Sequence, residues 1–204
     1  YNKEMDFYLK RIMNIHYKDK NKFKKSVYLG DGKFNYSDFY KRIKHNYKGL
    51  ITLQAARSDK VNDIELIKDY LFDLKNSQLS TKLKIGIMQG RTKIRKKYNL
   101  CPKNWSEEFK IAQTNNFKHI EMIVDKNLSS HNPIVKNLNL NKKIKEMSYS
   151  INVDYYVHNK INKKNIYLLS NVINFAEKNK FKIIVLPLIE KSKLNNNELN
   201  YVIK

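Results

Sequence analysis

The sequence is poor in cysteine, proline and glycine, with one, three and five of these residues in a chain of 204. The single cysteine, Cys101, excludes an intrachain disulfide, and with no secretory signal visible it indicates a reduced, cytoplasmic setting. No apolar run approaches the ~20 residues that span a bilayer, so no membrane partner is expected. The motifs GxSxG and HExxH, a Walker lysine pattern and paired cysteines are also absent, which removes the common hydrolase, zinc-protease and P-loop interpretations.

Acidic residues are few beside basic ones, 19 against 41, and the formal net charge is +22. Such a charge is typical of proteins that bind nucleic acid or anionic membranes. Here the lysines are spread along the chain among asparagines, and no stretch alternates basic and aromatic residues as in a single-strand-binding groove. The pattern therefore favours a generally basic surface, and argues against a nucleic-acid partner. The densest basic patch, Lys93–Lys97, would also suit an anionic group on a small substrate.

The length allows one good-sized domain or parts of two, and a hydrophobic fraction of 41% is enough for a core. The first residue is Tyr1 rather than Met, and Asn195–Lys204 reads as a helix cut short. We therefore expect a fragment of a longer chain.

Short apolar runs recur at intervals of 38, 33, 36, 31 and 32 residues, with helical patterns between them. This spacing is the rhythm of a parallel α/β fold, either a (β/α) barrel or a doubly wound open sheet. A complete (β/α)₈ barrel needs ~250 residues, so six units would leave two missing. Shared helical faces are expected for Phe39, Ile43 and Tyr47, for Ile64, Ile67, Leu71 and Leu74, and for Ile166, Leu169, Ile173 and Ala176. The six predicted strands are Ile12–Tyr17, Leu50–Leu53, Leu83–Met88, His119–Val124, Ser150–Tyr155 and Lys182–Pro187.

Polar residues stand at or just past the carboxyl end of each predicted strand. In both parallel α/β architectures ligands bind at that edge, so these residues predict one pocket for a small polar ligand. They are His16, Lys18, Asp19, Gln54, Arg57, Gln89, Arg91, Glu121, Asp125, Asp154 and Glu190.

Leu83–Asp125 reads as strand, polar loop, helix and strand. Asn104 to Glu107 resembles a capping box at the helix start, and Asn116 offers a stop signal. Trp105, Phe109 and Ala112 fall on one helical face. The unit predicts two parallel strands joined by a right-handed crossover.

His16 ends a predicted strand, where a neutral imidazole could bind a divalent metal or simply bond to its neighbours. Gly30-Asp31-Gly32 could present backbone N–H groups to an anion, but a tight turn is the favoured interpretation because the dinucleotide motif is missing.

Several motifs resemble those of sugar phosphate isomerases and epimerases, which are xylose isomerase-like TIM barrels. Residues 81–204 resemble the amino-terminal βα units of that family, through Ile85–Arg91 (IGIMQGR), His119–Asp125 (HIEMIVD) and Asn152–Tyr156 (NVDYY). Residues 1–80 resemble its carboxyl-terminal units, through IHYKDK, the Gly30–Gly32 loop and GLITLQAAR. The resemblance thus implies a partial barrel whose βα units, numbered as in the family, follow the order 7-8-1-2-3-4. It also implies that the strands of units 8 and 1 pair, with Leu53 beside Ile85. A junction of two tandem barrels is preferred over a permuted barrel.

The resemblance further implies a divalent metal (Mn, Mg, Co or Zn) held by Glu, Asp, His and Glu, and a proton moved next to a sugar carbonyl. Only His16 matches a metal ligand: Gln54 stands where the last Glu is expected, and the resemblance implies that the ligands of the family's fifth and sixth strands are not in this chain. The substrate-binding candidates are Gln54, Arg57, Gln89, Arg91, Glu121 and Asp154, and no catalytic residue is assigned.

The leading hypothesis is therefore an isomerase or epimerase acting on a sugar or sugar phosphate, of which this fragment would be inactive alone. One alternative is an endonuclease-IV-like DNA repair enzyme, which the positive charge favours and the shortage of histidines opposes. The other is a non-catalytic sugar-binding barrel, which Gln54 in place of an acid favours.

Overall fold

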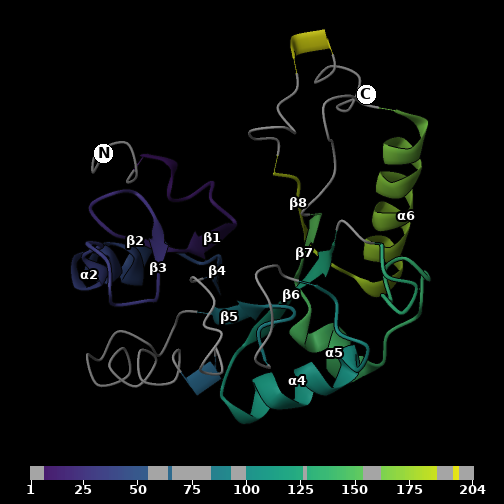
Figure 1. Cartoon of the computed structure of the whole chain (residues 1–204), viewed down its shortest axis with the longest axis horizontal. Helices are drawn as coiled ribbons and strands as arrows, with labels where there is room; N and C mark the ends of the chain where they lie inside the picture. Colours follow the sequence, from purple (N-terminus) through teal and green to yellow (C-terminus); the bar gives the residue numbers. More distant parts are fainter. Residues whose placement is uncertain are drawn as a thin grey trace.

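A computed structural model describes residues 7–54, 64–65, 84–92, 100–125, 128–153, 162–187 and 195–197. Six parallel strands form one sheet, and their order in the sheet is their order along the chain. The sheet is curled like half of a barrel (Figure 1). The predicted parallel α/β architecture, a partial barrel of six strands with helices, is confirmed. The strands are β1 (Asn14–Tyr17), β4 (Leu50–Leu53), β5 (Lys84–Met88), β6 (His119–Val124), β7 (Ser150–Val153) and β8 (Ile183–Val185).

The two parts of the chain that were predicted to belong to different ends of a barrel meet at β4 and β5. These strands pair in parallel, with Ile51 opposite Ile85 and Leu53 opposite Ile87. Pairing across this seam is confirmed, but the predicted neighbour of Leu53 was wrong by two residues. A shift of two residues leaves every side chain on the same face, so the apolar pattern does not fix it. The barrel numbers 7-8-1-2-3-4, and the boundary at residue 80, stay predictions.

The two faces of the sheet differ because successive side chains of a strand point to opposite sides. One set of alternate residues is apolar and joins the main core beneath the helices: Tyr17, Ile51, Leu53, Ile85, Ile87, Ile120, Met122, Val124, Ile151 and Val153. The other set is polar in most strands and faces the inside of the curl. It includes Asn14, His16, Thr52, His119, Glu121, Ser150 and Asn152.

Four described helices lie on the outer side of the curled sheet (Figure 1). Three begin at an asparagine whose side chain accepts a hydrogen bond from the backbone N–H three residues on, which stabilises the first turn. The helices are α2 (Tyr36–Asn46), α4 (Trp105–Thr114), α5 (Lys142–Met147) and α6 (Lys163–Asn179). None of the helices in the described ranges is long and apolar enough to cross a membrane.

Helix α4 begins where the sequence predicts, but not in the predicted way. Asn104 makes no side-chain capping bond, because its φ of −93° and ψ of 51° are not the extended conformation that a cap requires. The predicted capping box was therefore wrong. The stop signal is confirmed: Asn116 has a φ of 64°, and Phe117 N–H bonds back to Ala112 C=O at 3.0 Å.

The predicted helix faces are confirmed in α2 and α4 and partly wrong in α6. Ile43, Phe109 and Ala112 are buried. In α6, Ile173 is 47% exposed and Val172 is buried instead, because Val172 continues the spacing to Phe175 and Ala176. Of the predicted face between residues 64 and 74, only Ile64 falls in the described part and is buried; Ile67, Leu71 and Leu74 lie outside the described residues.

The Gly30–Gly32 segment is a turn wrapped around a carboxylate of the same chain. Gly30 N–H and Gly32 N–H both donate to Asp19 Oδ2, at 3.1 and 3.0 Å. Asp19 belongs to a small antiparallel pair, β2 (Asp19–Lys20) and β3 (Ser26–Val27). The backbone groups that could have received an external anion are therefore used internally, as the turn interpretation expects.

Candidate functional site

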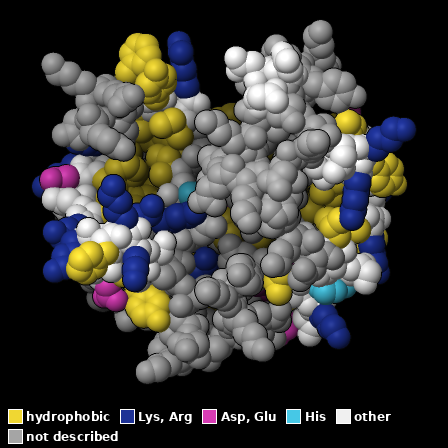
Figure 2. Space-filling view, turned by 45° about the horizontal axis from the view of Figure 1, so that its top comes forward, with side chains coloured by type: hydrophobic (Ala, Val, Ile, Leu, Met, Phe, Trp, Pro, Cys, Tyr) yellow, Lys and Arg dark blue, Asp and Glu magenta, His cyan; other side chains and the backbone are white. Residues whose placement is uncertain are grey.

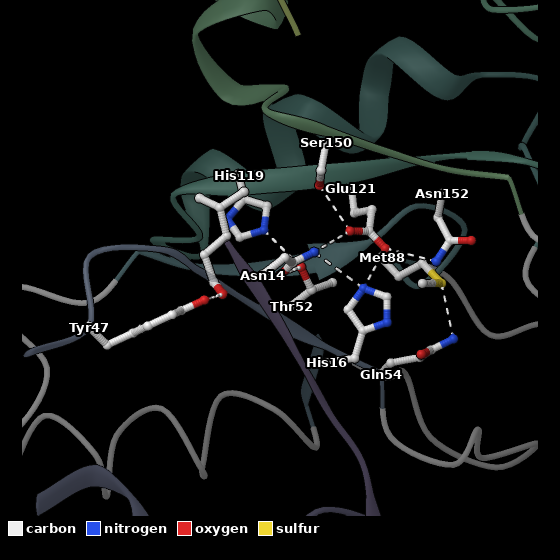
Figure 3. A network of polar contacts seen from close by, with 11 residues as sticks. Asn14, His16, Tyr47, Thr52, Gln54, Met88, His119, Glu121, Ser150 and Asn152 are labelled. Atoms are coloured by element: carbon white, nitrogen blue, oxygen red, sulfur yellow. Dashed lines mark hydrogen bonds and ion pairs between the residues drawn. The ribbon is translucent and has the colours of Figure 1, made fainter. Parts of the chain in front are cut away.

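The inner face of the sheet gathers polar side chains around one carboxylate, that of Glu121 (Figure 3). Glu121 Oε1 lies 2.8 Å from His16 Nε2 and accepts a hydrogen bond from Asn152 Nδ2 at 3.1 Å. Its other oxygen, Oε2, accepts from Asn14 Nδ2 at 2.6 Å and from Ser150 Oγ at 2.9 Å. Two strands, β1 and β7, therefore supply four donors to a side chain that has no exposed surface.

These four donors decide the charge of Glu121. Burial alone opposes ionisation of a carboxyl group, but the hydrogen bonds from His16, Asn152 and Ser150 outweigh it, so the pKa of Glu121 lies below its usual value. Glu121 is consequently a carboxylate at neutral pH. A carboxylate can only accept, so the proton of the shared bond sits on His16 Nε2.

His16 is the member of the pair that solvent can reach. Its side chain is 22% exposed, whereas that of Glu121 is fully covered. With Nε2 donating to Glu121, the lone pair of His16 lies on Nδ1. A carboxylate held in this way fixes the orientation of the imidazole and stabilises its protonated form. The pair thus has the arrangement of a general base supported by an acid residue.

A second histidine is connected to Glu121 through a chain of hydrogen bonds. Thr52 Oγ1 donates its only hydrogen to Asn14 Oδ1 at 3.0 Å. The contact of 3.0 Å between Thr52 Oγ1 and His119 Nε2 must therefore have His119 as the donor. Asn14 in turn donates to Glu121, so a directed chain runs from His119 through Thr52 and Asn14 to the carboxylate. The chain fixes the neutral tautomer of His119 and the orientation of the Asn14 amide.

We expect His119 to make the fold sensitive to mild acid. Burial, with smaller contributions from His16 and Lys84, lowers the pKa of His119 from 6.5 to about 4, against an opposing effect of Glu121. The unfolded chain takes up this proton near pH 6.5 and the folded chain near pH 4. The free energy of unfolding should therefore fall by about 3 kcal/mol between pH 7 and pH 4 from this group alone.

The comparison variant is His119→Gln, which retains an N–H donor for Thr52 but does not titrate. Urea unfolding at pH 7 and at pH 4 should show a drop about 3 kcal/mol smaller in the variant than in the wild type. Equal drops in both proteins would show that His119 is not the buried, uncharged group described above.

Gly86 makes room for the His119 ring. The two residues are opposite each other in the β5–β6 pair, and a Cβ on Gly86 would lie 2.3–2.4 Å from three atoms of the ring. We expect Gly86→Ala to lower the free energy of unfolding by about 1–3 kcal/mol through this overlap. In a double-mutant cycle with His119→Ala, the cost of Gly86→Ala should largely disappear. Additive effects of the two substitutions would contradict the close packing of this pair.

Two amide oxygens in the cluster have no hydrogen-bond partner within the described ranges. They are Gln54 Oε1 and Asn152 Oδ1, and both are buried. Gln54 follows β4 and donates its Nε2 to Met88 Sδ at 3.4 Å, while Asn152 donates to Glu121. Buried acceptors without a donor are costly, so these oxygens suit a ligand that brings hydroxyl groups.

Comparisons with known proteins leave this site to be interpreted from its geometry. No protein-family model, curated protein or solved structure matches the chain. The resemblance to sugar phosphate isomerases and epimerases therefore stays a prediction from the motifs.

The other predicted site residues have different outcomes. Glu121 belongs to the cluster, but it is the third residue of β6 rather than a residue at its carboxyl end. Gln89 is buried, and its Oε1 accepts from Ile123 N–H at 3.1 Å, so it ties the end of β5 to β6. Arg91 is 6% exposed. Arg57 and Asp154 lie outside the described residues.

Five members of the cluster were not predicted from the sequence, although a signal for them is present in it. Polar residues alternate with apolar ones inside the strands, as in Asn14-Ile15-His16. This alternation predicts a polar inner face, which the residues at the strand ends alone do not reveal. The missed residues are Asn14, Thr52, His119, Ser150 and Asn152.

The cluster does not contain the ligand set expected for a divalent metal. No group of three or more His, Cys, Asp or Glu side chains able to hold a metal occurs within the described ranges. Both oxygens of Glu121 already accept two hydrogen bonds each, which leaves His16 Nδ1 as one open ligand position. The residues that the structure describes therefore do not form a metal centre around Glu121.

Proposed function

We propose that this chain takes part in an isomerase or epimerase-like reaction, in which a proton moves between carbons of a sugar or sugar derivative. The observation that carries the proposal is the His16–Glu121 pair, a reachable imidazole at 2.8 Å from a buried carboxylate on the polar inner face of a parallel sheet. Proton abstraction next to a carbonyl needs a positioned base whose protonated form is stabilised. The pair supplies both requirements.

In the proposed reaction, His16 Nδ1 takes the proton from the carbon beside the sugar carbonyl. The electron pair of the broken C–H bond forms the double bond of an enediol, and the hydroxyl proton passes to the former carbonyl oxygen. The imidazolium then returns its proton to the neighbouring carbon, which interconverts an aldose and a ketose. Glu121 keeps the imidazole oriented and stabilises its charge while the proton is held.

The amide groups around the pair would bind the substrate. Gln54 Oε1 and Asn152 Oδ1 are acceptors that need donors, and a sugar presents several hydroxyl donors along one short molecule. Amide side chains can also donate to a carbonyl or hydroxyl oxygen. This complementarity favours a polyhydroxylated substrate over an apolar one.

A non-catalytic sugar-binding protein is the second candidate. It is favoured by Gln54, which cannot act as a proton base, and by the full set of hydrogen bonds on Glu121, which commits that carboxylate to holding its neighbours. The DNA-repair alternative receives less support, because DNA binding favours a continuous basic face. Figure 2 shows Lys and Arg side chains scattered over the described parts of one face of the molecule.

The proposal is tested by hydrogen exchange with the intact protein. The protein is incubated in D₂O with a panel of aldoses, ketoses and their phosphates, and NMR follows the proton on the carbon beside the carbonyl. The isomerase proposal expects exchange with at least one sugar. Saturable binding of a sugar without any exchange would favour the non-catalytic candidate, and neither binding nor exchange would contradict both.

A further inference from the structure

A cavity lies at the amino ends of the strands, and none of the residues that line it belongs to the Glu121 cluster. It has a volume of about 650 Å³, within the range typical of small-molecule sites. Residues that begin or precede the strands line it, among them Lys48 before β4, Lys84 at the start of β5, and Tyr149 before β7. Glu121 pairs with Met88 at the other end of β5, so the two regions are separated along the strands.

Four lysines dominate the chemistry of this amino-edge cavity. Lys10, Lys48, Lys84 and Lys182 all line it, and no Asp or Glu does so among the residues that the structure describes. The Lys84 ammonium lies 5.3 Å from the centroid of the Tyr149 ring, which holds that charge at the cavity wall. The remaining lining is apolar and includes Leu9 and Leu50, both buried.

Like charges around a shared cavity repel one another, and an anion between them removes that repulsion. A compact anion pairs best with ammonium groups that meet at one point, whereas a row of phosphates can reach lysines on several sides of a cavity. The lysines come from four separate parts of the chain, preceding β1, β4 and β8 and opening β5. A linear polyanion therefore fits the distribution of charge better than a single phosphate.

We propose that the amino-edge cavity binds a ligand that carries a chain of two or more phosphate groups. The ammonium groups of Lys10, Lys48, Lys84 and Lys182 pair with its oxygens, and the apolar lining covers one side of the ligand. None of the residues lining the cavity belongs to the Glu121 cluster, although the Tyr149 ring meets the His119 ring edge-on at 6.4 Å.

The test is isothermal titration calorimetry of the intact protein with inorganic tripolyphosphate at physiological ionic strength. The wild type should bind one equivalent saturably, and inorganic phosphate at least tenfold more weakly. Lys84→Gln/Lys182→Gln should lower the affinity for tripolyphosphate at least tenfold. The matched control, Lys110→Gln/Lys163→Gln, removes the same charge from exposed positions on α4 and α6 and should change the affinity less than twofold.

An equal loss in both double variants would overturn the proposal, because it would show attraction to the overall positive charge. Absence of saturable binding by the wild type would also overturn it. Adenosine triphosphate serves as a second probe: tighter binding than tripolyphosphate assigns the site to nucleotides, and equal binding assigns it to free polyphosphate. The variant His16→Gln, which tests the base of the sugar proposal, should retain the wild-type affinity for tripolyphosphate, so failure of the sugar proposal and failure of this one are distinguishable.

Discussion

A Glu121→Ala variant is expected to lose about 3–5 kcal/mol of unfolding free energy, the cost typical of breaking a buried charged pair. The substitution leaves four donors, from His16, Asn14, Ser150 and Asn152, facing a cavity without an acceptor. Each buried donor that loses its partner costs free energy of its own. Equilibrium urea unfolding at pH 7, followed by circular dichroism, measures the effect.

The matched control is Glu146→Ala, because Glu146 is an exposed carboxylate whose pair with Lys142 spans 4.0 Å on α5. Exposed pairs of this kind contribute little, so the control should change the unfolding free energy by less than about 1 kcal/mol. If Glu121→Ala were as mild as Glu146→Ala, Glu121 could not be the buried centre of the cluster.

The second large effect is expected at His16. If the imidazole is the base, His16→Gln removes the solvent-reachable group that takes the proton, while the glutamine can still donate a hydrogen bond to Glu121. The rate of α-proton exchange in D₂O should then fall about 10²–10⁴-fold, the usual contribution of a general base. The affinity for the sugar should change much less, because the amide acceptors at Gln54 and Asn152 remain.

His131→Gln is the control for this experiment. His131 makes a contact of 2.7 Å from Nε2 to the Cys101 carbonyl oxygen and has no contact with the cluster in any described interaction. Its replacement should leave the exchange rate within about twofold of the wild type. Exchange that persists at the wild-type rate in His16→Gln would assign the base to another residue.

Much of the fold could be predicted from the sequence, because its signal is local. Each apolar run became a strand at nearly the predicted position, and the intervals between the runs left room for one helix each. A parallel sheet in chain order then follows from short right-handed crossovers. Asn116 ended its helix as predicted, since an asparagine tolerates the left-handed conformation found there.

The register and the centre of the site could not be predicted in the same way. The neighbour of Leu53 differs from the expected one by two residues, a change that leaves the pattern of faces intact. The role of Glu121 depends on Asn14, which lies 107 residues earlier in the chain. Only the curl of the sheet brings β1 within reach of β6, although β4 and β5 lie between them in the sheet. Local patterns carry no information about such a contact.

The most direct test of the account is NMR observation of the His16 ring while the intact protein is titrated with the sugar that exchanges fastest. If the His16–Glu121 pair is the binding and reaction site, the His16 ring resonances should shift saturably with the sugar, whereas those of His131 should not move. Saturable binding of the sugar with the His16 resonances unchanged would contradict the account, because the ligand would then lie elsewhere.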